Sequence, residues 1–253
     1  MTRKAFVSID QDQVNYSHRT IAEYLAACWL VKSIREGLPV SRVCSLVCVD
    51  NYPALELRGL YAWLVQLLPE SADVLMVSDP YGVLVLGDVS CLSLSGRKSL
   101  LHALEKLAEK DPWFRAQDWT SEPLGALSTS EMANDFKSVL SRQPRQFHLR
   151  SVVLNAIKHG EQQPELEEDL LQILCDNDAY YAERHDAFEG LIKAIPNGKQ
   201  LVFNATNKLQ ISGVNLCLKG AVISRLYADH YNVEDVVHML LIISVTKILK
   251  ITQ

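Results

Sequence analysis

Residues 82–89, Gly-Val-Leu-Val-Leu-Gly-Asp-Val, have the spacing in this sequence that is closest to a nucleotide-binding motif. Two glycines separated by four residues are typical of a P-loop, whose backbone N–H groups bind phosphates. That loop next needs a lysine for the β- and γ-phosphates, and then a serine or threonine for Mg²⁺. Asp88 and Val89 occupy these positions, so a negative charge lies where phosphate would bind and the oxygen ligand is missing. We therefore reject a P-loop here, and the sequence contains no other P-loop and no GxGxxG pattern.

Cysteines, a charged cluster and an aromatic cluster are the other candidates for chemistry. Cys44 and Cys48 are spaced to share a helix face, but a structural zinc ion needs about four ligands and no second pair follows at suitable spacing. Residues 183–186, Glu-Arg-His-Asp, are adjacent on a predicted helix and so do not face one another. We interpret the two cysteines as core residues and the charged cluster as a solvated face. The aromatic residues within 113–119 are interpreted as anchors of a long loop, with a binding platform as the less favoured alternative.

The length and composition limit the classes of protein to which this chain can belong. The chain has 253 residues, 48% of them hydrophobic, which is enough for one large domain or two small ones. A net charge of -5 gives no electrostatic reason to expect nucleic acid as a ligand. The six cysteines lie mostly in apolar runs and no secretory segment opens the sequence, so we expect a reducing, cytoplasmic setting. The longest apolar run, residues 236–245, is shorter than the roughly 18–20 residues of a membrane span, so we expect no membrane partner.

Residues 16–30 form the helix around which the N-terminal part is organised. Ser17 and Thr20 are possible N-caps, and Thr20 with Glu23 has the spacing of a capping box. Apolar residues recur at helical spacing and predict one buried face of Ile21, Tyr24, Leu25, Cys28 and Val31. Trp29 and Leu30 lie off this stripe, so we expect both to be exposed. Before the helix, residues 5–9 and 13–16 are predicted to form a β-hairpin.

From residue 41 onward the sequence is a series of amphipathic helical patterns separated by Pro, Gly and Asp-rich breaks. The pattern predicts helices at residues 42–49, 57–68, 69–76, 95–110, 131–141, 146–159, 165–175 and 180–195. If the end of the chain is a divergent last repeat, residues 216–227 and 233–249 can also be helical. Residues 83–86, Val-Leu-Val-Leu, are the segment that could instead be a strand. Such an array packs either as a compact bundle or as stacked antiparallel pairs, and no strict sequence period decides between them.

Several of these segments also carry a family resemblance, to NACHT-type STAND NTPases of bacteria. The winged-helix part of that family has a pattern that this chain matches with Tyr16, His18, Thr20, Ile21, Glu23, Tyr24, Leu25, Ala26 and Ala27. Blocks at residues 57–64, 79–84, 87–90 and 111–115 look like the region after the winged helix in one bacterial subgroup. The resemblance covers about residues 14–195 and fails beyond Pro196, where acidic residues give way to Asn, Val, Ile and Lys.

The resemblance implies an all-α fold, a HEAT-like helical repeat array with a partial winged helix at the N-terminus. We expect residues 1–40 to be a remnant of the winged-helix subdomain and residues 41–195 to be the helical array. Residues 196–253 would be a divergent helical tail, whose composition suggests truncation or a frameshift, with a divergent last repeat as the alternative. A complete winged helix needs two more helices upstream, so we expect Met1 to open a piece of a longer protein.

The resemblance assigns one site residue, His18. In that family the histidine at this helix start lies near the nucleotide phosphates and helps to hold the closed, ADP-bound form. The chemistry is suitable, because a helix N-terminus presents free N–H groups and a partial positive charge to an anion. A capping or packing histidine without a ligand is the alternative. ATP or ADP with Mg²⁺ are cofactors of the full-length family, and we expect no cofactor and no metal site in this chain alone.

The expected function is therefore that of a non-catalytic part of such an NTPase, its regulatory or sensor helical arm, in bacterial antiviral or stress defence. Its partners would be a protein ligand or the missing NTPase domain. Two alternatives stay open: a free-standing α-helical scaffold for protein–protein interaction, and a small α-helical enzyme with a site assembled from scattered residues. A scaffold predicts an exposed surface with polar and aromatic residues, whereas an enzyme predicts a closed pocket with convergent titratable groups.

Overall fold

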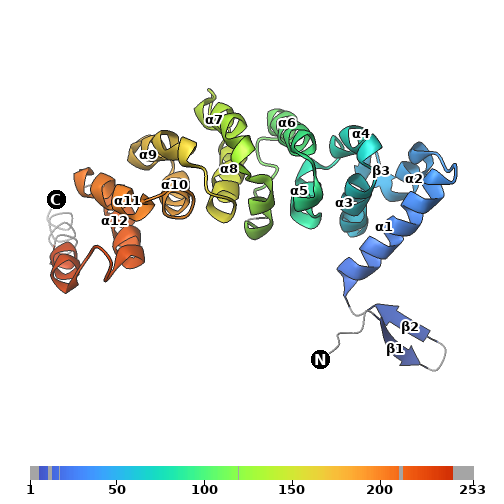
Figure 1. Cartoon of the computed structure of the whole chain (residues 1–253), viewed down its shortest axis with the longest axis horizontal. Coiled ribbons are helices and arrows are strands. Elements are labelled where there is room, and N and C mark those ends of the chain that lie inside the picture. The colour runs from blue at the N-terminus through green and yellow to red at the C-terminus, as the bar shows by residue number, and fades with distance from the viewer. Residues whose placement is uncertain (1–5, 11–12, 17, 119, 211–212, 242–253) are drawn as a thin grey trace, which may run out of the picture. The chain divides into compact units, whose positions relative to one another are not determined.

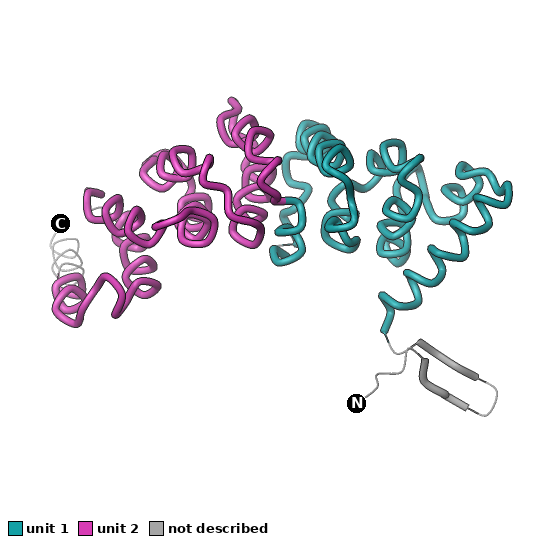
Figure 2. The backbone as a smooth tube through the Cα atoms, viewed as in Figure 1, with its two compact units in different colours: residues 1–127 teal, residues 128–253 magenta. Residues whose placement is uncertain are grey.

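The computed structural model of the chain is built almost wholly from helices (Figure 1). It describes residues 6–10, 13–16, 18–118, 120–210 and 213–241. The chain divides into two compact units, which we call unit 1 (Met1–Leu127) and unit 2 (Ser128–Gln253) (Figure 2). In the described part of the chain the sheets are two small antiparallel pairs, so the expected all-α class is confirmed. The expected boundaries lie at residues 40 and 195, whereas the packing divides the chain after Leu127.

Unit 1 begins with a β-hairpin and continues as α-helices of 5 to 17 residues and 3-10 helices. Its elements are β1 (Phe6–Asp10), β2 (Gln13–Tyr16), α1 (Arg19–Arg35), α2 (Val40–Val47), β3 (Cys48–Val49), β4 (Tyr52–Pro53), η1 (Leu55–Leu57), α3 (Arg58–Leu67), η2 (Pro69–Ser71), α4 (Ala72–Met76), α5 (Pro80–Leu86), η3 (Val89–Cys91), α6 (Leu94–Lys110) and η4 (Glu122–Leu127). β1 and β2 pair antiparallel with Val7 opposite Asn15, which confirms the predicted hairpin.

Unit 2 contains the longer run of regularly packed helices. Its elements are η5 (Ser130–Met132), α7 (Ala133–Ser141), α8 (Phe147–His159), η6 (Pro164–Leu166), α9 (Glu167–Cys175), α10 (Tyr181–Ala194), α11 (Gly198–Lys208), α12 (Gly213–Leu226) and a last helix over residues 233–241. α11 was not among the predicted helices. It packs on both α10 and α12, so residues 198–226 continue the same regular packing.

Within each unit the helices contact one another in a repeating order. In unit 2, α7 packs on α8, and each of α9, α10 and α11 packs on the next helix in the sequence. Each helix from α7 to α10 also packs on the helix two positions further along. In unit 1, α1 packs on α3, α3 on α5, and α4 on α6 in the same way. Alternate helices therefore form two layers inside each unit. The core lies between these layers, and in α8 every residue from His148 to Ile157 is buried.

The start of α1 differs from the predicted capping box. His18 is the N-cap residue, and its side chain makes no capping hydrogen bond. Glu23 does not reach back to a capping threonine, because its carboxylate pairs with the Arg19 guanidinium at 2.7 Å. Thr20 therefore lies inside the first turn and is exposed, while Ser17 lies outside the described residues. The ion pair between positions i and i+4 replaces the local cap.

The buried face of α1 is also rotated from the predicted one. Ala27, Leu30 and Val31 are buried, whereas Tyr24 and Leu25 are exposed. The expected exposure of Trp29 is confirmed at 65%, but the expected exposure of Leu30 is wrong because it is only 9% exposed. α1 packs mainly on α3, so the position of that one neighbour selects which part of a broadly apolar helix is covered.

Two further segments bear on the elements predicted from the sequence. Residues 83–86, which could instead have been a strand, lie in α5, as the predicted helical array requires, and α5 begins with Pro80 at its first position and Asp79 as N-cap. The helix predicted over 42–49 ends at Val47, because the chain then turns through Asp50 and Asn51. Both have positive φ, 51° and 67°, the conformation of a two-residue hairpin turn that joins β3 to β4.

Candidate functional site

His18, the one site residue assigned by resemblance, is exposed at the N-terminus of α1. Its backbone carbonyl accepts the Ile21 N–H at 3.1 Å, so the helix begins directly after it. The neighbouring Arg19 guanidinium contacts both the Glu23 carboxylate and the backbone carbonyl of Glu56, which ties the first turn of α1 to η1. The arrangement presents an imidazole and a helix N-terminus to solvent, and a contact with nucleotide phosphate stays a prediction.

The P-loop-like glycines lie at the two ends of a short helix and not in a phosphate-binding loop. Gly82 is in the first turn of α5, and its N–H donates to Asp79 Oδ1 at 2.9 Å. A Cβ at this position would lie 2.0 Å from Asp79 Oδ2, so glycine is needed for the close approach of the cap. The N–H of Gly82 is thus bound to a carboxylate of the chain itself, where a phosphate-binding loop would leave it free for the ligand.

Asp79 also joins two of the blocks that carry the family resemblance. The Arg58 guanidinium donates to its two carboxylate oxygens at 2.6 and 2.9 Å, a bidentate pair between α3 and the start of α5. The hydrogen bond with Asp79 raises the pKa of Arg58 above its ordinary value. Next along the chain, the Tyr81 ring packs edge-on against Phe114 with centroids 5.4 Å apart. Its hydroxyl donates to the Asp118 carbonyl at 2.9 Å.

The aromatic loop over residues 113–119 has both anchored and exposed members. Phe114 packs on Tyr81, and Arg115 is 1% exposed and donates to the carbonyls of Asp118 and Thr120. The prediction of a core anchor is therefore correct for Phe114 but wrong for Trp113, which is 70% exposed. Trp119 lies outside the described residues. No signal in the sequence marks the arginine as the buried residue of this group.

Cys44 and Cys48 line a cavity of about 670 Å³ together with Tyr61, Ser78 and the turn residue Asp50. Both cysteines are half-buried, so the interpretation that they are core residues is only partly correct. Burial raises the pKa of both thiols, which keeps them protonated and makes them weak nucleophiles and weak metal ligands. Among the residues that the structure describes, no three His, Cys, Asp or Glu side chains are grouped to hold a metal ion.

Tyr61, on the wall of this cavity, makes the stability of unit 1 depend on pH. It is 1% exposed, its hydroxyl donates to the Leu75 carbonyl at 2.9 Å, and burial raises its pKa from 10.0 to about 12. A raised pKa stabilises the fold fully below pH 10, and this contribution is lost as the pH rises through about 12. We expect ionisation of the Tyr61 phenol to lower the free energy of unfolding of unit 1 by about 2–3 kcal/mol between pH 10 and about pH 12.

Urea unfolding of the natural chain and of the Tyr61→Phe variant, below pH 10 and near pH 12, measures this contribution. At the lower pH the variant should be less stable by about 1 kcal/mol, because it lacks one hydrogen bond. As the pH rises, its free energy of unfolding should decline less steeply than that of the natural chain. The other tyrosines titrate in both proteins and cancel in the difference. Equal declines in the two proteins would contradict the prediction.

The charged cluster 183–186 on α10 is not the solvated face that we predicted. Glu183 and Arg184 are 2% and 1% exposed. Glu183 pairs with Arg150 of α8 at 2.6 Å, and Arg184 donates from Nε to the Leu174 carbonyl at 2.9 Å. Asp186 is half-buried and accepts a hydrogen bond from the Asn155 side chain at 2.9 Å. The contacts of these three residues join α10 to α8 and α9 and do not converge on a pocket.

Comparison of the chain with family models, with curated proteins and with solved structures gives no match. In the described residues, no helix combines the length and apolar character that crossing a membrane requires. The described residues contain buried ion pairs, helix caps and an exposed helical surface. A function can be argued from these features.

Proposed function

We propose that this chain is the regulatory, ligand-sensing helical arm of a bacterial NACHT-type STAND NTPase with a role in antiviral defence. It would transmit the binding of a protein ligand to an NTPase domain that lies outside this sequence. It would carry no catalysis of its own, and His18 would contact the nucleotide phosphates from the start of α1.

The observation that carries this proposal is the packing of the blocks that resemble the family. Arg58 from the first block binds Asp79 from the second, and Tyr81 from the second packs on Phe114 from the fourth. If the short motifs over residues 57–115 all belong to the same domain, they are expected to pack together in one cluster. The contacts of Arg58 with Asp79 and of Tyr81 with Phe114 agree with that expectation.

We further propose that the helices are HEAT-like repeats and that the β1–β2 hairpin is part of a winged helix. In support, three helices of unit 2, α7, α9 and α10, each pack both on the next helix and on the one after it, as stacked antiparallel pairs do. The hairpin directly precedes α1 and β2 contacts it, as expected for a wing that leads into the next helix. Stacks of this kind offer extended surfaces for protein ligands.

The genomic DNA upstream of the codon for Met1 tests the proposed parentage. An in-frame Walker motif a few hundred codons upstream would support an arm that belongs to an NTPase. An in-frame stop codon directly before Met1, with a ribosome-binding site, would contradict it. The second candidate function, a free-standing scaffold, would then be favoured by the exposed apolar side chains of unit 1, among them Trp29, Leu46 and Val74.

We expect the purified chain to release no phosphate from ATP or GTP. The Gly82 N–H is bound to Asp79, and the position after the second glycine is the acidic Asp88. The measurement is phosphate release by the natural chain and by an Asp88→Asn variant as a matched control. In a true P-loop the residue at this position contacts the phosphates, so removing its charge would change the rate. Turnover that survives repeated purification and is altered by the variant would refute the prediction.

A further inference from the structure

A pocket with charged and polar walls lies in the C-terminal part of unit 2, and its volume is about 240 Å³. Residues from α11, α12 and the helix over residues 233–241 line it. Lys219 and Asp235 bring opposite charges to it, and Tyr231 and His238 are further polar members of the wall. Pockets for drug-sized ligands have about 300–1,000 Å³, so this one has the size for a smaller molecule such as an amino acid.

Lys219 is the charged residue of this pocket that has no partner in the described part of the chain. Its side chain is half-buried on α12, yet its ammonium group makes no ion pair and no hydrogen bond with the described residues. Burial lowers the pKa of Lys219 below its ordinary value, because it penalises the charged form. A methionine of similar length would pack here without that cost, so the stability of unit 2 does not explain a lysine at this position.

Asp235 supplies the negative charge and is held in place by a reciprocal pair of hydrogen bonds at the start of its helix. Its Oδ2 accepts the Asn232 N–H at 2.9 Å, and its own N–H donates to Asn232 Oδ1 at 3.1 Å. Its second carboxylate oxygen, Oδ1, accepts no hydrogen bond from the described residues. Asp235 and Lys219 form no ion pair with each other, so the pocket presents a negative and a positive group at separate places.

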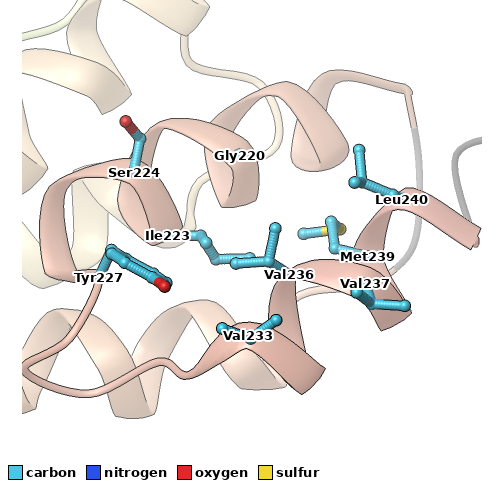
Figure 3. A pocket seen from close by; sticks show the side chains of 9 residues that line it. All are labelled: Gly220, Ile223, Ser224, Tyr227, Val233, Val236, Val237, Met239 and Leu240. Atoms are coloured by element: carbon cyan, nitrogen blue, oxygen red, sulfur yellow. The ribbon is translucent and has the colours of Figure 1, made fainter.

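The rest of the wall is apolar. Leu216 and Ile223 of α12 line it together with Met239. Ile223 and Met239 also line the apolar groove of about 500 Å³ in Figure 3. A free amino acid carries a carboxylate that complements Lys219 and an ammonium group that complements Asp235, and an apolar side chain would lie on this wall. Hydrogen bonds between charged groups are the stronger class of polar contact, so two of them would fix the orientation of the ligand.

We propose that this pocket binds a free α-amino acid with an apolar side chain, whose carboxylate pairs with Lys219 and whose ammonium group pairs with Asp235. The inference goes beyond the proposed function and does not depend on it, because a sensor arm and a free-standing scaffold could each carry such a pocket. The ligand is a small zwitterion, whereas the ligand of the proposed sensor arm is a protein.

Isothermal titration calorimetry of the full chain with leucine and with two matched compounds tests the proposal. The compound 4-methylpentanoate lacks the ammonium group of leucine, and 3-methylbutylamine lacks its carboxylate. Each loses one charged contact, so each should bind at least about tenfold more weakly than leucine. If leucine does not bind at millimolar concentrations, or binds no better than either matched compound, the proposal is overturned.

Two variants assign the charged contacts. Lys219→Met should weaken leucine and 4-methylpentanoate at least about tenfold and leave 3-methylbutylamine unchanged. Asp235→Asn keeps a side-chain oxygen for the Asn232 N–H, and it should weaken leucine and the amine but not 4-methylpentanoate.

The matched control is Lys208→Met, which removes an exposed lysine from the last turn of α11, outside the pocket, and should bind leucine as the natural chain does. Urea midpoints of Lys219→Met and Asp235→Asn close to that of the natural chain would show that the losses come from the site and not from the fold. Equal binding of leucine by Lys219→Met and Lys208→Met would overturn the proposal, because the ammonium group of Lys219 would then contribute nothing to recognition.

Discussion

Replacing Glu183 with alanine should lower the free energy of unfolding of unit 2 by about 3–5 kcal/mol. Its carboxylate binds the Arg150 guanidinium at 2.6 Å, and the two side chains are 1% and 4% exposed. It also accepts the N–H of Tyr180 at the start of α10. Without the carboxylate, Arg150 stays charged in the core between α8 and α10 and loses the one counter-ion to which it is hydrogen-bonded, with Asp176 as the remaining acid whose charge acts on it. The poorly compensated buried charge dominates the cost. Urea unfolding followed by circular dichroism measures the loss.

Two controls separate the buried charge from the loss of a contact. Arg145→Ala removes one partner of the ion pair with Asp176, whose side chains are 34% and 24% exposed, and should cost no more than about 1 kcal/mol. The double variant Arg150→Met with Glu183→Leu removes both charges, and it should be more stable than Glu183→Ala because no buried charge is left. A double variant as unstable as the single one would contradict this explanation.

Gly198→Ala should destabilise unit 2 by about 3 kcal/mol, because the added methyl group collides with main-chain atoms. Gly198 is the first residue of α11, and a Cβ there would lie 1.8 Å from the Leu191 carbonyl oxygen and 3.1 Å from the Ile192 Cα. The chain reaches this point through Asn197, whose φ of 57° turns α11 sharply back against the end of α10. A backbone carbonyl cannot move away as a flexible side chain would, so α11 itself must shift.

Gly213→Ala is the matched control, since Gly213 is likewise the first residue of a helix but a Cβ built on it would meet nothing within 4 Å. That variant should change the stability by less than about 1 kcal/mol, and in the stabilising direction, because alanine lowers the entropy of the unfolded chain. The measurement is the urea midpoint of both variants. Similar effects of the two substitutions would show that the collision with Leu191 does not control the turn.

The class of the fold and most of its helices follow from the local sequence. Apolar spacing predicted α3, α6, α8, α9 and α10 to within a few residues of their observed bounds. Helical periodicity and Pro or Gly breaks are local properties of the chain, so a short stretch of sequence is sufficient to specify them. The exact start of α1 did not follow in this way, because the local signals predicted Ser17 or Thr20 as the N-cap and the structure has His18 there.

Which faces of those helices are covered depends on tertiary packing. α1 is apolar enough to bury more than one face, and its packing on α3 covers Leu30 and leaves Tyr24 exposed. Likewise, the sequence 183–186 fits a solvated helix face, and only Arg150, 33 residues earlier, makes a buried Glu183 stable. Each of these outcomes depends on a partner distant in sequence, and such partners are set by packing between helices and not by the periodicity within one.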